Sequence, residues 1–80
     1  MSKLMILAIT WVDSSLQNGQ VDKDDFPKPE NITSIGFLVE HQDEYITLAR
    51  DDMGDGDYRG LLCIPRECIR ATTPIENPTP

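Results

Sequence analysis

The sequence has little positive charge and no run of basic residues. Seven Lys and Arg residues stand against 14 Asp and Glu residues, which gives a formal net charge of -7 over 80 residues. A protein that binds nucleic acid gains most of its affinity from basic side chains that neutralise phosphates. The composition therefore argues against a nucleic-acid partner. It favours a basic protein partner or a solvated acidic surface.

Long apolar segments are also lacking. The N-terminal stretch LMILAITWV is far shorter than the roughly 20 residues that a membrane-spanning helix needs. The residues after it supply only a poor cleavage site for a signal peptide. We expect a buried strand here, no membrane association and a cytoplasmic protein.

Residues that bind metals or perform catalysis are few. The chain has two cysteines, Cys63 and Cys68, and one histidine, His41, whereas a structural zinc site uses four such ligands. We expect two buried free thiols, no metal and no cofactor. His41 has no nucleophile motif or second catalytic partner beside it in the sequence, so we predict that the protein is not an enzyme.

The apolar pattern that is present predicts an all-β domain. Apolar residues alternate with polar ones in several short stretches, as in half-buried strands. The predicted strands cover residues 3–12, 34–41, 45–51, 58–64 and 69–73. Pro65 ends the fourth strand because proline cannot donate to a ladder. Arg66, Glu67 and Cys68 then fit one 3₁₀ turn.

The domain organisation follows from these strands. Residues 1–73 form one small domain, residues 13–33 form a long loop rich in Asp, Ser, Asn, Gly and Pro, and residues 74–80 form a flexible Pro-rich tail. The first strand is apolar on both of its alternating faces. It is therefore expected to be central, covered twice or part of an interface.

Five strands with a 3₁₀ turn before the last one resemble the Src-homology-3-like and Sm-like barrels. The resemblance to the first Sm motif is carried by Gly36, Asp43 and the apolar pair Ile46 and Leu48. It implies a small five-stranded barrel in which the last strand pairs with the first. Thr47 stands where the family usually has the Asn that contacts RNA, so the resemblance implies the fold and not RNA binding.

The layout also resembles a group of small tailed-bacteriophage and prophage proteins. The resemblance rests on ITWVDSS, SIGFLVEHQDEYITLA and GLLCIPRECI, which together extend from Ile9 to Ile69. It implies a phage setting and the cytoplasm of a bacterial host. It names no activity, because none of these segments carries a catalytic motif.

Candidate binding residues fall into three groups. The densest charge cluster is acidic and lies on the turn before the fourth strand; it comprises Asp51, Asp52, Asp55 and Asp57. The calcium-loop pattern fails there because Met53 occupies its third position, so a solvated turn is favoured over a cation site. Phe26 is an apolar anchor in the long loop, beside the acidic stretch DKDD.

The third group combines Trp11 with arginines. Trp11 either plugs the mouth of the barrel or anchors a partner, a role in which Trp is enriched. If two of the arginines, such as Arg59 and Arg66, converge on Trp11, they can hold a small phosphate-bearing ligand.

The first functional hypothesis is a non-enzymatic, small, acidic, phage-type protein that binds and modulates a host protein, in an accessory or anti-defence role. A phage protein is the other candidate partner. The alternatives are a homo-oligomeric barrel that sequesters a small nucleotide-like ligand, and a minor component of the virion or of its assembly. The sequence leaves these alternatives open.

Overall fold

The structure is a computed structural model that describes residues 3–14, 20, 22–26 and 28–79. These residues form five strands and two 3₁₀ turns, in the order β1 (Ile6–Asp13), η1 (Lys23–Asp25), β2 (Glu30–His41), β3 (Tyr45–Asp52), β4 (Tyr58–Pro65), η2 (Arg66–Cys68) and β5 (Ile69–Ile75). The predicted all-β class and the 3₁₀ turn after Pro65 are confirmed. None of the described residues belongs to a helix long and apolar enough to cross a membrane.

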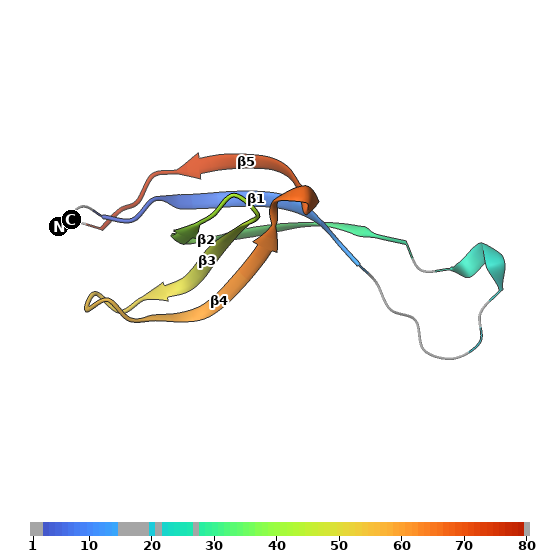
Figure 1. Ribbon diagram of the computed structural model, residues 1–80, viewed down its shortest axis with the longest axis horizontal. Coiled ribbons are helices and arrows are strands. Elements are labelled where there is room, and N and C mark those ends of the chain that lie inside the picture. Colours follow the sequence, from blue (N-terminus) through green and yellow to red (C-terminus); the bar gives the residue numbers. More distant parts are fainter. Residues whose placement is uncertain (1–2, 15–19, 21, 27, 80) are drawn as a thin grey trace.

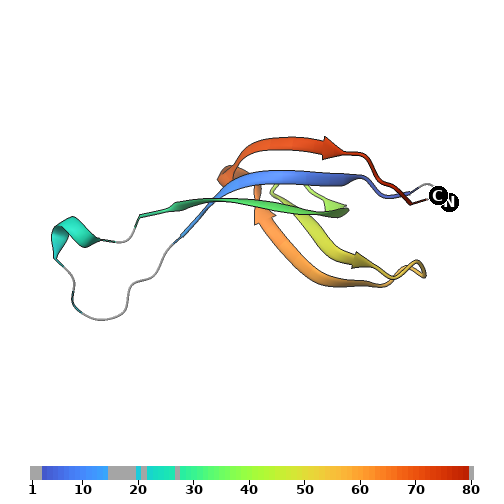
Figure 2. The same ribbon diagram turned by 180° about the vertical axis from the view of Figure 1, so that it is seen from behind.

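The strands form one antiparallel sheet in the order β4-β3-β2-β1-β5. β1 and β5 lie side by side on one side of the molecule, β3 and β4 lie on the other, and β2 links the two halves (Figures 1 and 2). The last strand pairs with the first, as expected. Through the described strands the sheet stays open, with β4 and β5 as its edges, so a closed barrel is not confirmed.

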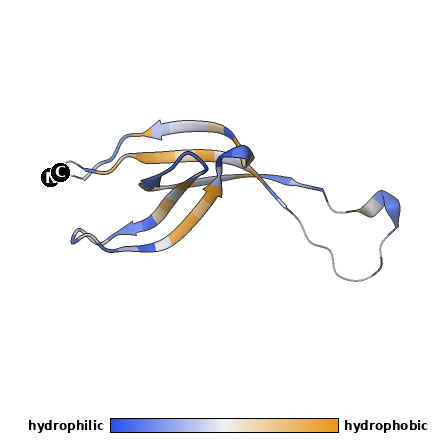
Figure 3. Ribbon diagram, in the orientation of Figure 1, coloured by the Kyte–Doolittle hydropathy of each residue, from blue (hydrophilic) through white to orange (hydrophobic). Residues whose placement is uncertain are grey.

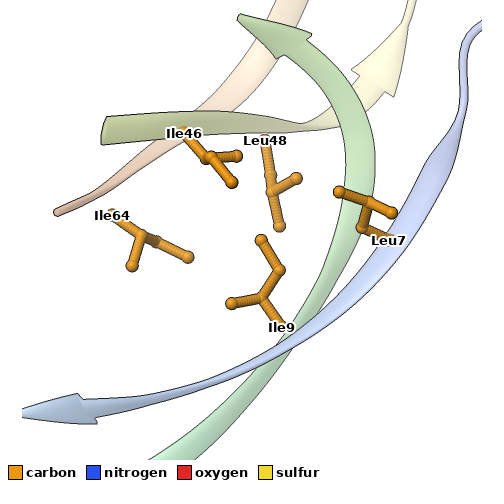
Figure 4. Close-up of a cluster of buried hydrophobic side chains, with 5 residues drawn as sticks. All are labelled: Leu7, Ile9, Ile46, Leu48 and Ile64. Atoms are coloured by element: carbon orange, nitrogen blue, oxygen red, sulfur yellow. The ribbon is translucent and has the colours of Figure 1, made fainter. Parts of the chain in front are cut away.

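The bend of the sheet encloses a small apolar core. Its buried side chains project from three strands into the same space (Figure 4); they are Leu7, Ile9, Ile46, Leu48 and Ile64. Full burial of an aliphatic side chain stabilises a fold by about 1.5–3 kcal/mol, and partly buried hydrophobic residues pack around this cluster: Trp11, Leu38, Leu62 and Ile69. We call the side of the sheet that faces this core the inner face and the opposite side the outer face.

β2 makes the bend possible through two local features. The register between β2 and β3 shifts between Leu38 and Glu40, and such an irregularity increases the local twist of a strand. Gly36 lies next to β3, where an added Cβ would be 2.8 Å from the carbonyl oxygen of Ala49. Glycine is therefore needed for the two strands to approach this closely.

The predicted loop 13–33 is too long at both ends. β1 continues to Asp13 and β2 already begins at Glu30, and the two are register partners. Together they form a two-stranded arm that extends away from the other strands, with η1 near its far end (Figure 1). Sequence analysis missed these strand ends because their residues are mostly polar or exposed, which removes the alternating signal. Residues 15–19, 21 and 27 lie outside the described part of the loop.

The predicted flexible tail 74–80 is also corrected for the residues that the structure describes. Pro74 and Ile75 belong to β5 and pair with Leu7 and Ile6. Asn77 is buried, and its side-chain Nδ2 donates to the carbonyl oxygen of Leu4 at 2.6 Å. The segment that follows β5 is thus fastened beside the residues that precede β1, and Figure 1 shows these two described segments side by side. Pro80 lies outside the described residues.

Candidate functional site

The predicted acidic cluster lies in the hairpin between β3 and β4. Asp52 accepts a hydrogen bond from the backbone N–H of Gly54, and Asp55 accepts one from the N–H of Asp57, each at 3.0 Å. Gly54 and Gly56 adopt positive φ angles of 83° and 94°. These carboxylates therefore stabilise a tight turn. Among the described residues, no group of three or more His, Cys, Asp or Glu side chains is arranged to hold a metal ion.

Two of the arginines neutralise one of these aspartates. A carboxylate oxygen of Asp51 lies 3.1 Å from Nη2 of Arg50 and 3.3 Å from Nε of Arg59. Arg66 lies beyond the opposite end of β4. The arginines therefore do not converge on one point, and the structure does not place Arg59 and Arg66 around Trp11 as a phosphate site would require.

Trp11 and Phe26 occupy different environments. The indole N–H of Trp11 donates to the hydroxyl of Ser34 at 3.1 Å, and the ring packs against the core. Trp11 is half-buried where the arm meets the rest of the sheet. Phe26 directly follows η1 on the arm, and 57% of its surface is exposed. Of the predicted candidates, Phe26 is the large apolar side chain most available to a partner.

One pocket among the described residues was not predicted. It is a pocket of about 540 Å³ where β3 begins and β4 ends, next to η2; its lining comprises Glu44, Tyr45, Cys63, Pro65 and Glu67. A shallower depression of about 250 Å³ adjoins it and shares Glu44 and Tyr45. We call the larger site the end pocket. Cys63 is exposed there, which corrects the prediction of two buried thiols; Cys68 is half-buried.

Arg66 fixes the shape of the end pocket. Its backbone N–H donates to the carbonyl oxygen of Glu44 at 2.9 Å, and its Nε donates to the carbonyl oxygen of Gln42 at 2.6 Å. Its Nη2 lies 2.7 Å from Nε2 of His41, which must be the acceptor because guanidinium only donates. Arg66 thus ties η2 to the turn between β2 and β3, so the pocket is preformed.

The charged residues in the lining of the end pocket are acidic. Glu44 and Glu67 line it and no basic residue does. Glu40 raises the pKa of the Tyr45 phenol through its charge, with further contributions from desolvation and from a hydrogen bond to the same carboxylate. A ring flanked by carboxylates is suited to an ammonium or guanidinium group, which both the charges and the aromatic face attract.

The sequence contains no local signal for this pocket. Glu44 and Tyr45 look like the end of a turn and the start of a strand, while Pro65 and Glu67 look like a strand end and a 3₁₀ turn. Only the pairing of β3 with β4, which places Tyr45 opposite Pro65, brings them together. The prediction of that hairpin could have suggested the pair, but not the concavity beside it.

Comparisons of this chain with protein-family models, with curated proteins and with solved structures found no match.

Proposed function

We propose that this protein is a non-enzymatic, phage-type binding protein that engages and modulates a host protein, and that the end pocket receives a basic side chain of that partner. The acidic, preformed end pocket is the observation that carries the proposal. Binding pockets of this kind combine an apolar surface with a few well-placed polar groups. Here Tyr45 and Pro65 provide the surface, and the carboxylates of Glu44 and Glu67 provide the charge.

The proposed scaffold is a small Src-homology-3-like or Sm-like barrel. The strand order supports it, since β5 pairs with β1 and a 3₁₀ turn leads from β4 into β5. The resemblance of the sequence layout to tailed-phage proteins supports the host as the source of the partner. A nucleotide ligand is disfavoured at the end pocket, because its phosphates would lie against Glu44 and Glu67.

The test is the removal of charge inside and outside the pocket. Host proteins bound by the purified chain are identified by mass spectrometry, and the strongest is then titrated against variants by calorimetry. The double variant Glu44→Gln/Glu67→Gln should weaken binding by more than tenfold, as expected for hydrogen bonds to charged groups. The matched control Asp55→Asn/Asp57→Asn removes the same charge from the β3–β4 turn and should leave affinity nearly unchanged.

Two results contradict the proposal. The first is that no host protein binds specifically. The second is that both double variants weaken binding equally, since that would indicate a general effect of net charge and not recognition by the end pocket.

A further inference from the structure

Where β1 pairs with β5 and with residues 30–37 of β2, the outer face carries no charged side chain at the positions that these registers place there. Further along β2, Glu40 lies on the outer side, paired with Thr47. Side chains alternate between the two faces of a strand, and the inner positions are fixed by Leu7 and Ile9 in the core. The outer positions of the three paired strands are Ile6, Ala8, Thr10, Val12, Asn31, Thr33, Ile35, Phe37, Ala71, Thr73 and Ile75. We call this surface the neutral face.

The neutral face is apolar and accessible to solvent. Ile35 is 63% exposed and Ile75 is 37% exposed, whereas Ile6 and Phe37 are half-buried. The hydroxyls of Thr10 and Thr33 lie 2.9 Å apart and satisfy each other. Figure 3 shows β1 as hydrophobic along most of its length, although only one of its faces contacts the core. The second apolar face of β1 therefore lacks a cover among the described residues.

The charge and the shape of the neutral face favour a second copy of this chain as the molecule that covers it. The chain has a net charge of -7, so most contacts between two copies would bring like charges together, and the neutral face avoids this cost. The face also complements itself, since the exposed Ile35 projects beside the small side chain of Ala8, its register partner. A two-fold axis can place Ile35 of each copy over Ala8 of the other, as isologous interfaces require.

The size of the neutral face sets the expected affinity between two copies of the chain. Three strands with about seven residues each cover roughly 15 Å by 23 Å, and projecting side chains enlarge this to roughly 500 Å² per copy. The total of about 1,000 Å² lies at the lower limit for a specific interface. Such an interface is consistent with a reversible dimer and not with an obligate one.

We propose that the neutral face binds a second copy of this chain and forms a weak two-fold dimer in which the β5–β1–β2 faces pack on each other. The end pocket belongs to the other half of the sheet and to η2, so both sites can be occupied at once. The dimer goes beyond the proposed function and does not depend on it, since it needs no partner protein.

The experiment is sedimentation velocity on the full chain over a wide concentration series. We expect a monomer–dimer equilibrium with a dissociation constant on the order of 10 μM. Ile35→Glu should raise this constant at least tenfold, because two carboxylates would be buried near each other. Met53→Glu is the matched control, since Met53 is 47% exposed in the turn between β3 and β4, away from the neutral face, and it should leave the dimer intact.

A second variant keeps the test valid if Ile35→Glu misfolds. Thr73→Glu also introduces a charge on the neutral face, at an exposed position of the edge strand β5. It should dissociate the dimer, and it replaces Ile35→Glu as the test if circular dichroism shows that Ile35→Glu does not fold. A wild-type chain that is monomeric throughout the series overturns the proposal. A dimer that resists both neutral-face variants, or one that Met53→Glu disrupts equally, also overturns it.

Discussion

Tyr45 is the residue whose chemistry depends most on its neighbours. It pairs with Pro65 across two strands, and the charge of Glu40 raises the pKa of its phenol above the ordinary value of about 10. Glu40 reaches this position because its carboxylate also accepts a hydrogen bond from the Thr47 hydroxyl at 3.2 Å. The charge of Glu40 thus favours the protonated form of the Tyr45 phenol.

Titration of this phenol provides a prediction with a definite sign. Because the folded pKa is raised, the protonated phenol stabilises the fold at pH values below the ordinary tyrosine pKa, and this stabilisation is lost as the pH rises through the folded pKa. Glu40→Gln should lower the pKa of Tyr45 toward its ordinary value. The near-ultraviolet absorbance of tyrosinate, recorded in a Tyr58→Phe background, measures the shift.

Glu30→Gln is the control for that titration. It removes the same charge from an exposed position on the arm, at the far end of β2 from Glu40. An equal fall in the pKa of Tyr45 in both variants would show that net charge, and not the neighbouring carboxylate, causes the shift.

Among the elements, β5 depends most on contacts outside its own ladder. It is an edge strand that pairs only with β1, and its side chains are mostly exposed. The segment after it compensates, because the side-chain oxygen of Asn77 accepts a hydrogen bond from the N–H of Thr79 while Nδ2 donates to Leu4. Lys3 adds a hydrogen bond from Nζ to the carbonyl oxygen of Asn77 at 2.8 Å.

Asn77→Ala should therefore weaken the attachment of β5. The carbonyl of Leu4 would lose its side-chain partner, and we expect the free energy of unfolding to fall by about 1–3 kcal/mol in urea titrations. Amide hydrogen exchange should rise first in β5 and in the first residues of β1. Glu76→Ala, an exposed neighbour, should change stability by less than about 0.5 kcal/mol; an equal loss in both variants would contradict the role of Asn77.

The whole molecule separates charge from apolar surface. Acidic side chains lie at the end pocket and in the β3–β4 turn, whereas the neutral face, where β1 pairs with β5 and with residues 30–37 of β2, carries no charge at its register positions. The molecule is also elongated, with extents of 54, 23 and 22 Å, because the arm projects from the sheet. An elongated shape with distinct surfaces allows more than one contact at a time.

This separation predicts opposite responses to salt. Raising the ionic strength about tenfold shortens the screening length about threefold, so binding of a basic partner at the end pocket should weaken. The dimer should keep its affinity or gain slightly, since salt also screens the repulsion between two acidic chains. Calorimetry and sedimentation at two salt concentrations measure the two responses; a dimer that dissociates in salt would show that ion pairs, and not the neutral face, hold it.

Sequence patterns determined the parts of the fold that local chemistry controls. Period-two alternation located β3 and β4, Pro65 ended β4, and the aspartates and glycines of the β3–β4 turn make the hydrogen bonds and positive φ angles that their residue types favour. The apolar character of both faces of β1 also indicated an inner strand, and β1 does lie between β2 and β5.

Tertiary structure alone decided the rest. The arm ends of β1 and β2 are strands because they pair with each other, and the tail is ordered because Asn77 reaches Leu4, 73 residues away in the chain. The end pocket likewise joins residues from β3, β4 and η2 that have no common motif. Local propensity acts over a few residues, whereas hydrogen bonds and concave surfaces between distant segments exist only once the chain has folded.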